Sequence, residues 1–185
     1  MSSTVDHGSD ADRAGGIWLL GECRPGKAVE PEVGELLAFA QRLTAAAGPR
    51  PVSLLLLGET ADSEAAAVVK VWGVETVAMA TPPGGARGEA GARLLADFLE
   101  PRRPAYVCCR HSSWSFDLQP ALAVFLAAAA IAGVQDLQVR DGELFFGRPT
   151  AGGRQTAWIR SRTPVAVISL QPGSCPPAGE NKGRP

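Results

Sequence analysis

Three short segments of this sequence carry residue types that could do chemistry. Gly21 to Lys27 follows an apolar run and matches the first seven positions of a phosphate-binding P-loop. Cys109 and His111 could pair as a nucleophile and a base. His111 to Asp117 places serine hydroxyls at the start of an apolar helix, where backbone N–H groups can hold an anion. The chemistry to weigh is therefore phosphate binding, thiol catalysis and anion binding.

The neighbouring residues argue against the first two possibilities, phosphate binding by a P-loop and thiol catalysis. Ala28 stands where a P-loop needs a hydroxyl for Mg²⁺, and Pro25 lacks one of the N–H groups that would cradle phosphate. Residues two apart at a strand end rarely reach each other, and the chain holds 2 histidines in all. Its 4 cysteines form no CxxC pair and no metal-like spacing. We therefore expect no catalytic residue and no metal site.

The segment 111–117, which follows the strand expected at 105–109, has two possible interpretations. The candidate cofactor-binding residues are Gly21, His111, Ser112, Ser113 and Ser115. In open α/β sheets, ligands bind at the carboxyl ends of strands, where these residues fall. Helix capping explains the serines without a ligand, with Ser113 or Ser115 as the N-cap and Asp117 in the first turn. The sequence leaves both interpretations open.

Arginines gather near the C-terminal end of the chain. They are Arg140, Arg148, Arg154, Arg160 and Arg162. A solvated face is the ordinary explanation for such a scattered set. The alternative is a docking surface for an acidic partner, for which Arg148, Arg154 and Arg160 are the candidates.

Composition narrows the class of protein. The chain has 185 residues, 45% of them hydrophobic, and a net charge of −1, which suits one globular domain without general attraction to nucleic acid. The longest apolar run, 121–132, is shorter than the ~20 residues of a membrane span. We expect a buried helix there and no membrane span. The cysteine usage and the absence of a signal-peptide pattern favour a cytoplasmic location.

Apolar segments and turn residues predict four βα units followed by a β-rich end. Strands are expected at 17–20, 52–57, 75–80 and 105–109, with helices opening at Pro31 and spanning about 62–72, 87–99 and 117–132. Strands joined by short turns are expected at 134–139, 144–148, 155–160 and 165–170, with Asp141-Gly142 as a hairpin signal. The expected fold is a parallel sheet with helices on both faces and appended antiparallel strands. Residues 1–15 are expected to form a disordered leader, 16–174 the folded domain and 175–185 a flexible tail.

The residues at this strand–helix corner include Ser113, Asp117, Leu118, Pro120, Leu122 and Ala123. Their types and spacing resemble the Thr-Ser-x-Gly-(Arg/Lys)-(Asp/Asn)-Leu-x-Pro-Arg-Leu/Val-Ala signature in the N-terminal domain of electron transfer flavoprotein alpha subunits. Arg148 to Gly153 looks like the family's Arg-Pro-x-x-Gly-Gly hairpin, and Gln171 to Ser174 is similar to its Arg-Pro-Gly-x closure. The resemblance spans roughly 17–174.

The departures from the family pattern mostly remove charge. Phe116, Ala121 and Gln171 stand where the family has basic residues, and Ser115 replaces a glycine. The sequence holds no counterpart of the Gly-Ile-Ser-Gly-Ala-Ile-Gln-His segment of the family's FAD-binding C-terminal domain. The expectation is a truncated alpha-like subunit that consists of the N-terminal domain only.

The resemblance implies a three-layer Rossmann-like domain of the adenine-nucleotide-hydrolase-like class, with strand order near 3-2-1-4-5. It implies a non-catalytic scaffold or docking component of a flavin-dependent electron transfer complex, in a heterodimer. The implied partner is an electron transfer flavoprotein beta-like subunit, or a flavin or iron–sulfur redox enzyme. FAD is expected only with a partner subunit and not in the isolated chain. The alternative is a free-standing module that binds AMP or the adenylate of FAD.

Overall fold

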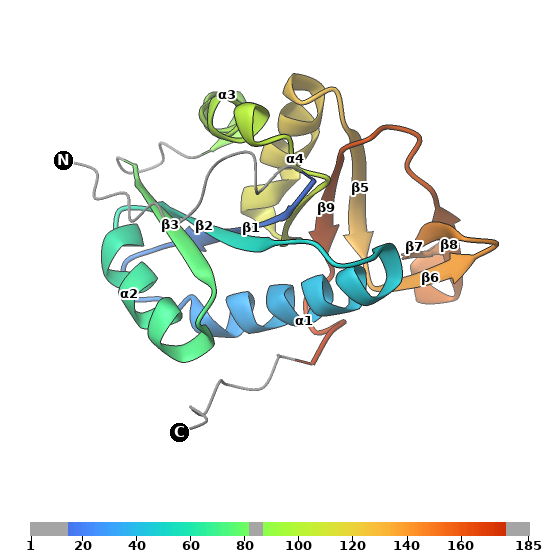
Figure 1. Cartoon of the computed structure of the whole chain (residues 1–185), viewed down its shortest axis with the longest axis horizontal. Coiled ribbons are helices and arrows are strands. Elements are labelled where there is room, and N and C mark those ends of the chain that lie inside the picture. The colour runs from blue at the N-terminus through green and yellow to red at the C-terminus, as the bar shows by residue number, and fades with distance from the viewer. Residues whose placement is uncertain (1–14, 82–86, 177–185) are drawn as a thin grey trace.

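The computed structural model describes residues 15–81 and 87–176. The predicted leader up to residue 14, part of the loop between Thr81 and Gly88, and the predicted tail beyond Pro176 lie outside these ranges. The described residues form three layers, with a six-stranded parallel sheet between pairs of helices, and a smaller three-stranded sheet beside one end (Figure 1). The predicted fold class is confirmed.

The strands and helices follow the predicted order with shifted ends. The main sheet contains β1 (Ile17–Cys23), β2 (Val52–Gly58), β3 (Glu75–Ala80), β4 (Tyr106–Arg110), β5 (Ala129–Val134) and β9 (Ala166–Leu170). The long helices are α1 (Glu30–Ala47), α2 (Ala61–Trp72), α3 (Gly88–Leu99) and α4 (Ser113–Phe125), and η2 (Glu100–Arg102) is a short 3₁₀ turn after α3. The smaller sheet contains β6 (Asp136–Arg140), β7 (Glu143–Thr150) and β8 (Gln155–Ile159), with the 3₁₀ turn η3 (Ala151–Gly153) between the last two.

The order of the main sheet is β3-β2-β1-β4-β9-β5, and all its neighbouring strands are parallel. The expected order near 3-2-1-4-5 holds for the first four strands. The last strand of the chain is then inserted between β4 and β5, whereas the sequence grouped it with the antiparallel end. All five residues of β9 are buried, as is typical of a central parallel strand.

Alternation along β1 divides the core between the two faces of the sheet. Ile17 and Leu19 pack with α1 and α2 in one buried cluster. Trp18 and Leu20 pack with α3 and α4 in the other. The four helices thus cover the sheet in pairs, two on each face (Figure 1).

The predicted helix over 117–132 is wrong at both ends. Helix α4 begins at Ser113 and ends at Phe125, and 129–134 is strand β5 instead. Ala127 has φ +48°, and the N–H of Ala128 donates to the carbonyl of Ala123 at 2.8 Å. This is the Schellman geometry that glycine usually provides. The end of the helix could not be predicted from the sequence, because the alanine-rich segment contains no glycine or proline at that point.

The smaller sheet is antiparallel in the order β6-β7-β8. Its first turn confirms the Asp141-Gly142 hairpin, since both residues have positive φ, +52° and +76°. The predicted strand at 134–139 is divided in the structure, because β5 ends at Val134 and β6 begins at Asp136. Phe146 of β7 is buried in the core cluster that also contains α1. This contact anchors the smaller sheet to the main domain.

Within the described ranges, no helix is both long and apolar enough to cross a membrane.

The chain after β9 packs against α1. The carboxylate of Glu35 accepts the N–H of Gly173 at 3.2 Å, and Arg42 donates to the buried sulfur of Cys175 at 3.5 Å. The packed part of the chain therefore reaches Cys175.

Candidate functional site at the carboxyl edge of the sheet

The chain changes direction between strands β1 and β4. From β1 it continues through α1 to β2, whereas β4 leads through α4 towards the other end of the sheet (Figure 1). In open α/β sheets such a switch point is where ligands bind. The pairing of β1 with β4 ends at Leu20 and Cys109, so Gly21 lies close to the end of β4 and to the segment after Arg110. The structure thus brings together two of the segments that the sequence singled out.

The carboxylate of Glu22 lies between two arginines at this edge. Its side chain is 10% exposed and forms ion pairs with Arg24 and with Arg87, the latter at 3.0 Å. Arg24 comes from the turn after β1, and Arg87 from the start of α3. Glu22 therefore joins the end of β1 to the segment that leads into α3.

A second carboxylate, that of Glu32 in the first turn of α1, lies 3.9 Å from the guanidinium of Arg110. Burial raises the pKa of Glu32, and the nearby charges of Arg110 and Lys27 oppose this change. The Nε atom of Arg110 is buried and has no hydrogen-bond partner among the described residues. The sequence did not point to Glu32, because an acidic residue in the first turn of a helix is ordinary.

The serines after β4 form a reciprocal cap. Ser112 is the N-cap of α4, and its N–H donates to the Oγ of Ser115 at 2.9 Å. The N–H of Ser115 donates in turn to the Oγ of Ser112 at 3.5 Å. The structure therefore corrects the prediction of Ser113 or Ser115 as the N-cap, and it places Asp117 beyond the first turn. Ser113 is exposed, whereas Ser115 is fully buried.

His111 links three strands of the main sheet. Its Nδ1 atom lies 2.9 Å from the Oγ of Ser169 in β9, and that oxygen accepts the N–H of Gly133 in β5 at 3.1 Å. Ser169 was not among the residues predicted from the sequence. The signal was a single polar residue within an apolar strand, because a buried hydroxyl must find a hydrogen-bond partner.

Gly21 and Cys109 are tightly packed. A Cβ atom at Gly21 would lie 2.7 Å from Cδ2 of Leu56, so the neighbouring strand already fills that space. Cys109 is buried, and its burial, together with the charge of Glu32, raises the pKa of the thiol to about 12. A thiol in this environment stays protonated near neutral pH and is a poor nucleophile. In 15–81 and 87–176, no group of three or more His, Cys, Asp or Glu side chains could hold a metal ion.

These contacts test whether the corner fits a flavin. A cradle needs open space beside Gly21 and free N–H donors at the start of α4. Leu56 occupies the space, and the reciprocal cap uses the N–H groups of Ser112 and Ser115. Two of the contacts that a cradle would need are thus already made within the chain, and we derive no chemical step through flavin. Cofactor contacts at Gly21 and 111–115 stay predictions.

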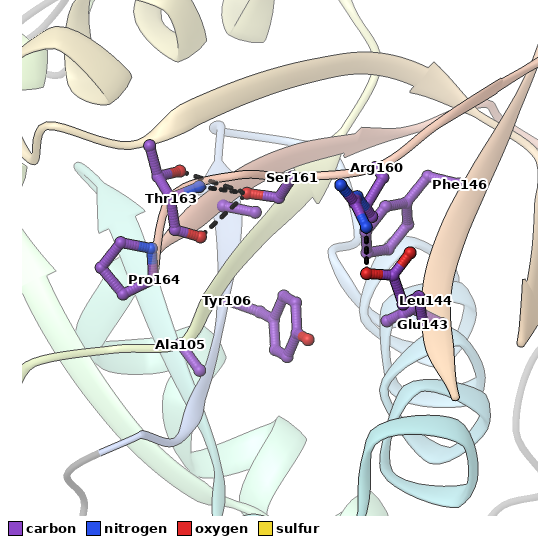
Figure 2. A pocket seen from close by; sticks show the side chains of 10 residues that line it. Ala105, Tyr106, Glu143, Leu144, Phe146, Arg160, Ser161, Thr163 and Pro164 are labelled. Atoms are coloured by element: carbon purple, nitrogen blue, oxygen red, sulfur yellow. Dashed lines mark hydrogen bonds and ion pairs between the residues drawn. The ribbon is translucent and has the colours of Figure 1, made fainter. Parts of the chain in front are cut away.

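The three candidate docking arginines lie on or next to the smaller sheet. Arg148 is exposed on β7, and Arg154 is exposed after the η3 turn, where its Nε donates to the carbonyl of Ala151 at 3.1 Å. Arg160, directly after β8, is paired with Glu143 (Figure 2). Arg148 and Arg154 therefore keep their charge free of ion pairs with the described residues, whereas the charge of Arg160 is balanced.

A stacked cluster of aromatic and basic side chains lies on the same sheet. The guanidinium of Arg140 lies 4.8 Å from the ring centroid of Trp158 and 5.5 Å from that of Phe145. Gln138 holds Arg140 in place by accepting from its Nη2 at 2.9 Å. Trp158 was not among the residues predicted from the sequence, although strand alternation could have placed it on the same face as Phe145 and Gln138. We call Arg140, Phe145 and Trp158 the stacked cluster.

The parallel sheet with helices on both faces and an appended antiparallel sheet define a Rossmann-like α/β domain. The chain belongs to the electron transfer flavoprotein domain family, whose model matches residues 17–185. It is 24% identical over 160 residues to the electron transfer flavoprotein subunit alpha of Bacillus subtilis (strain 168). That match covers 85% of this chain and 48% of the relative, so the chain spans about half the length of the curated relative. The predicted resemblance to alpha subunits is confirmed.

Proposed function

We propose that this chain is an electron transfer flavoprotein alpha-like component that docks a partner subunit within a flavin-dependent electron transfer complex. The family and the relative, which is named as a subunit, support this role. The observation that carries the docking proposal is the stacked cluster on the smaller sheet, with the guanidinium of Arg140 over the ring of Trp158.

The composition of this surface suits a protein interface. Tryptophan and arginine are enriched among the residues that contribute most to binding between proteins. Arg148 and Arg154 add exposed positive charge to the same sheet, with Arg148 on the face opposite the stacked cluster. A complementary partner presents acidic side chains around an apolar patch. Our proposed partner is an electron transfer flavoprotein beta-like subunit in a heterodimer, and a flavin or iron–sulfur redox enzyme is the second choice.

A second part of the proposal concerns which subunit supplies the flavin site. At the switch point, Leu56 packs against Gly21, and the reciprocal cap uses the N–H groups of Ser112 and Ser115. We propose that a partner supplies most of any flavin site, so that the purified chain alone is colourless. A stoichiometric flavin absorbance band in the isolated chain would overturn this part of the proposal.

Titration with the beta-like subunit of the same organism tests docking. We expect a one-to-one complex by calorimetry and by size-exclusion chromatography with light scattering. Arg140→Ala should weaken the complex about tenfold or more, because it removes a stacked and charged contact. Lys70→Ser is the matched control, since Lys70 is exposed on α2 at the other end of the molecule. Equal affinity of the Arg140 variant and the wild type would contradict docking through this sheet.

The second candidate function is binding of AMP or of the adenylate of FAD at the switch point. Basic residues outnumber acidic ones there: Arg24, Lys27, Arg87 and Arg110 surround Glu22 and Glu32. Calorimetry with AMP, ADP and FAD on the isolated chain separates the two functions. Binding that Arg110→Gln abolishes would favour the nucleotide module, and no binding would favour the docking component.

A further inference from the structure

A cavity of about 540 Å³ opens at the amino edge of the main sheet, opposite the switch point. Pro104 and Ala105 approach it just before β4, and Pro164 and Val165 approach it just before β9. The end of α4 closes another side. Cavities that bind small molecules usually measure about 300–1,000 Å³, so this one is large enough for a ligand.

Much of the wall is apolar. Its apolar side chains include Pro104, Phe125, Leu126, Pro164 and Val165. The flat ring of Phe125, with aliphatic side chains beside it, suits a flat, apolar ligand body. The turn at Ala127, which has φ +48°, brings the end of α4 to this wall.

Two arginines at the cavity give it a positive charge. Arg50 donates from Nη1 to the carbonyl of Gly15 at 2.7 Å, while its Nε is buried without a hydrogen-bond partner among the described residues. The side chain of Arg103 is exposed and forms no ion pair or hydrogen bond with the described residues. Glu100 also lines the cavity. The balance of two arginines against one glutamate suits a ligand with a single negative charge.

A neighbouring cavity of about 260 Å³ shares Ala105 and Pro164 with the first but differs in its charge. Arg160 there is paired with Glu143, and Ser161 is hydrogen-bonded to Thr163 (Figure 2). The ring of Tyr106 also lines this cavity, with its hydroxyl directed away from Ser161 and Thr163 (Figure 2). Because Arg160 is already paired with Glu143, we expect the smaller cavity to bind the acid group of a ligand more weakly than the larger cavity does.

We propose that the larger cavity is a binding site for a small organic anion, one with a flat apolar body and one carboxylate or similar acid group. Arg50 and Arg103 bind the acid group, and the wall of Phe125, Leu126 and Val165 covers the body. Charged hydrogen bonds fix the orientation of the ligand, and burial of its apolar surface supplies most of the affinity. This site is separate from the surface proposed for docking and from the switch point.

Calorimetry with three probes tests this site on the full chain. 2-Naphthoate carries both features, 2-naphthylmethanol lacks the charge, and acetate lacks the apolar body. We expect 2-naphthoate to bind at least about tenfold more tightly than either of the others. If 2-naphthylmethanol binds as tightly as 2-naphthoate, the cavity is apolar and does not recognise the anion. If acetate binds as tightly as 2-naphthoate, the binding reflects surface charge alone. Either result, or no binding of 2-naphthoate, overturns the proposal.

A pair of arginine variants localises the binding. Arg103→Gln should weaken 2-naphthoate binding about tenfold, because it removes a charged donor from the larger cavity. Arg162→Gln is the matched control, since Arg162 is exposed and lines neither cavity. It should leave 2-naphthoate binding unchanged. The proposal is overturned if Arg103→Gln has no effect or if both variants weaken binding equally.

Discussion

The side-chain amide of Gln119, inside helix α4, donates a hydrogen bond to the carbonyl of Ile131 in strand β5 at 3.0 Å. The same amide donates to the carbonyl of Val167 in strand β9 at 2.9 Å. The register of these two strands shifts between Ile131 and Val134, where Gly133 has φ +67°. Gln119 therefore ties the helix to the place where the last pair of strands is irregular.

Gln119→Leu should destabilise the fold strongly. Leucine has a similar size but leaves the two carbonyls without this donor, and each unsatisfied buried group costs about 1–3 kcal/mol. We expect the free energy of unfolding to fall by roughly 2–4 kcal/mol. Urea denaturation followed by circular dichroism measures the change. Gln155→Leu, at an exposed position of β8, is the control and should stay within about 0.5 kcal/mol of the wild type.

Gly147→Ala should disturb the stacked cluster without changing any charge. A Cβ atom at Gly147 would lie 2.9 Å from Cζ3 of Trp158, so the indole ring must move. Arg140 would then lose part of its stacking surface. We expect affinity for the beta-like subunit to fall several-fold, together with a change in tryptophan fluorescence. If fluorescence changes while affinity stays the same, the stacked cluster is not part of the interface.

Ala127→Gly should stabilise the protein. Ala127 occupies the left-handed position at the end of α4, where a side chain costs about 1 kcal/mol relative to glycine. We expect a gain of roughly that size in the free energy of unfolding. Ala121→Gly, inside the same helix, should have the opposite sign and cost about 0.5–1 kcal/mol. A loss of stability in both variants would contradict this helix end.

Stability should depend on pH through Glu32. Burial raises the pKa of this carboxyl above its ordinary 4.5 in the folded state. The unfolded chain then loses its proton at lower pH, so the free energy of unfolding falls as pH rises from below 4.5 to above the raised value. Glu32→Gln does not ionise, so it should gain stability relative to the wild type across that interval. Urea denaturation over a pH series checks this, with Glu89→Gln, exposed on α3, as the control.

Cys109 should react slowly while the protein is folded. Its pKa of about 12 leaves almost no thiolate at pH 8, and the side chain is buried. Iodoacetamide labelling followed by mass spectrometry should modify Cys109 only after unfolding in urea. His111→Asn should leave the labelling rate unchanged. Rapid modification in the folded wild type that depends on His111 would restore the nucleophile-and-base interpretation.

Local patterns predicted most elements because each carries its own signal. The strand at 75–80 has the predicted bounds, and Gly73 ends α2 in the left-handed conformation. Ala127 gave no such signal, so the predicted positions for the end of α4 and the start of β5 were wrong. The corner at 111–115 was placed correctly at a strand end, but its N-cap was assigned one residue or more too late. Hydroxyls at neighbouring positions can all cap a helix, and only the path of the backbone decides between them.

The sequence by itself determined the class of fold and the family. Apolar periodicity, turn residues and the order of weak motifs depend on neighbours in the chain, so they are readable without a structure. Only the tertiary structure decided that β9 lies between β4 and β5, that Ser169 meets His111, and that Arg140 stacks on Trp158. These pairings join residues 18 to 60 positions apart. Contacts at such separations arise when distant segments pack together, and no local pattern records them.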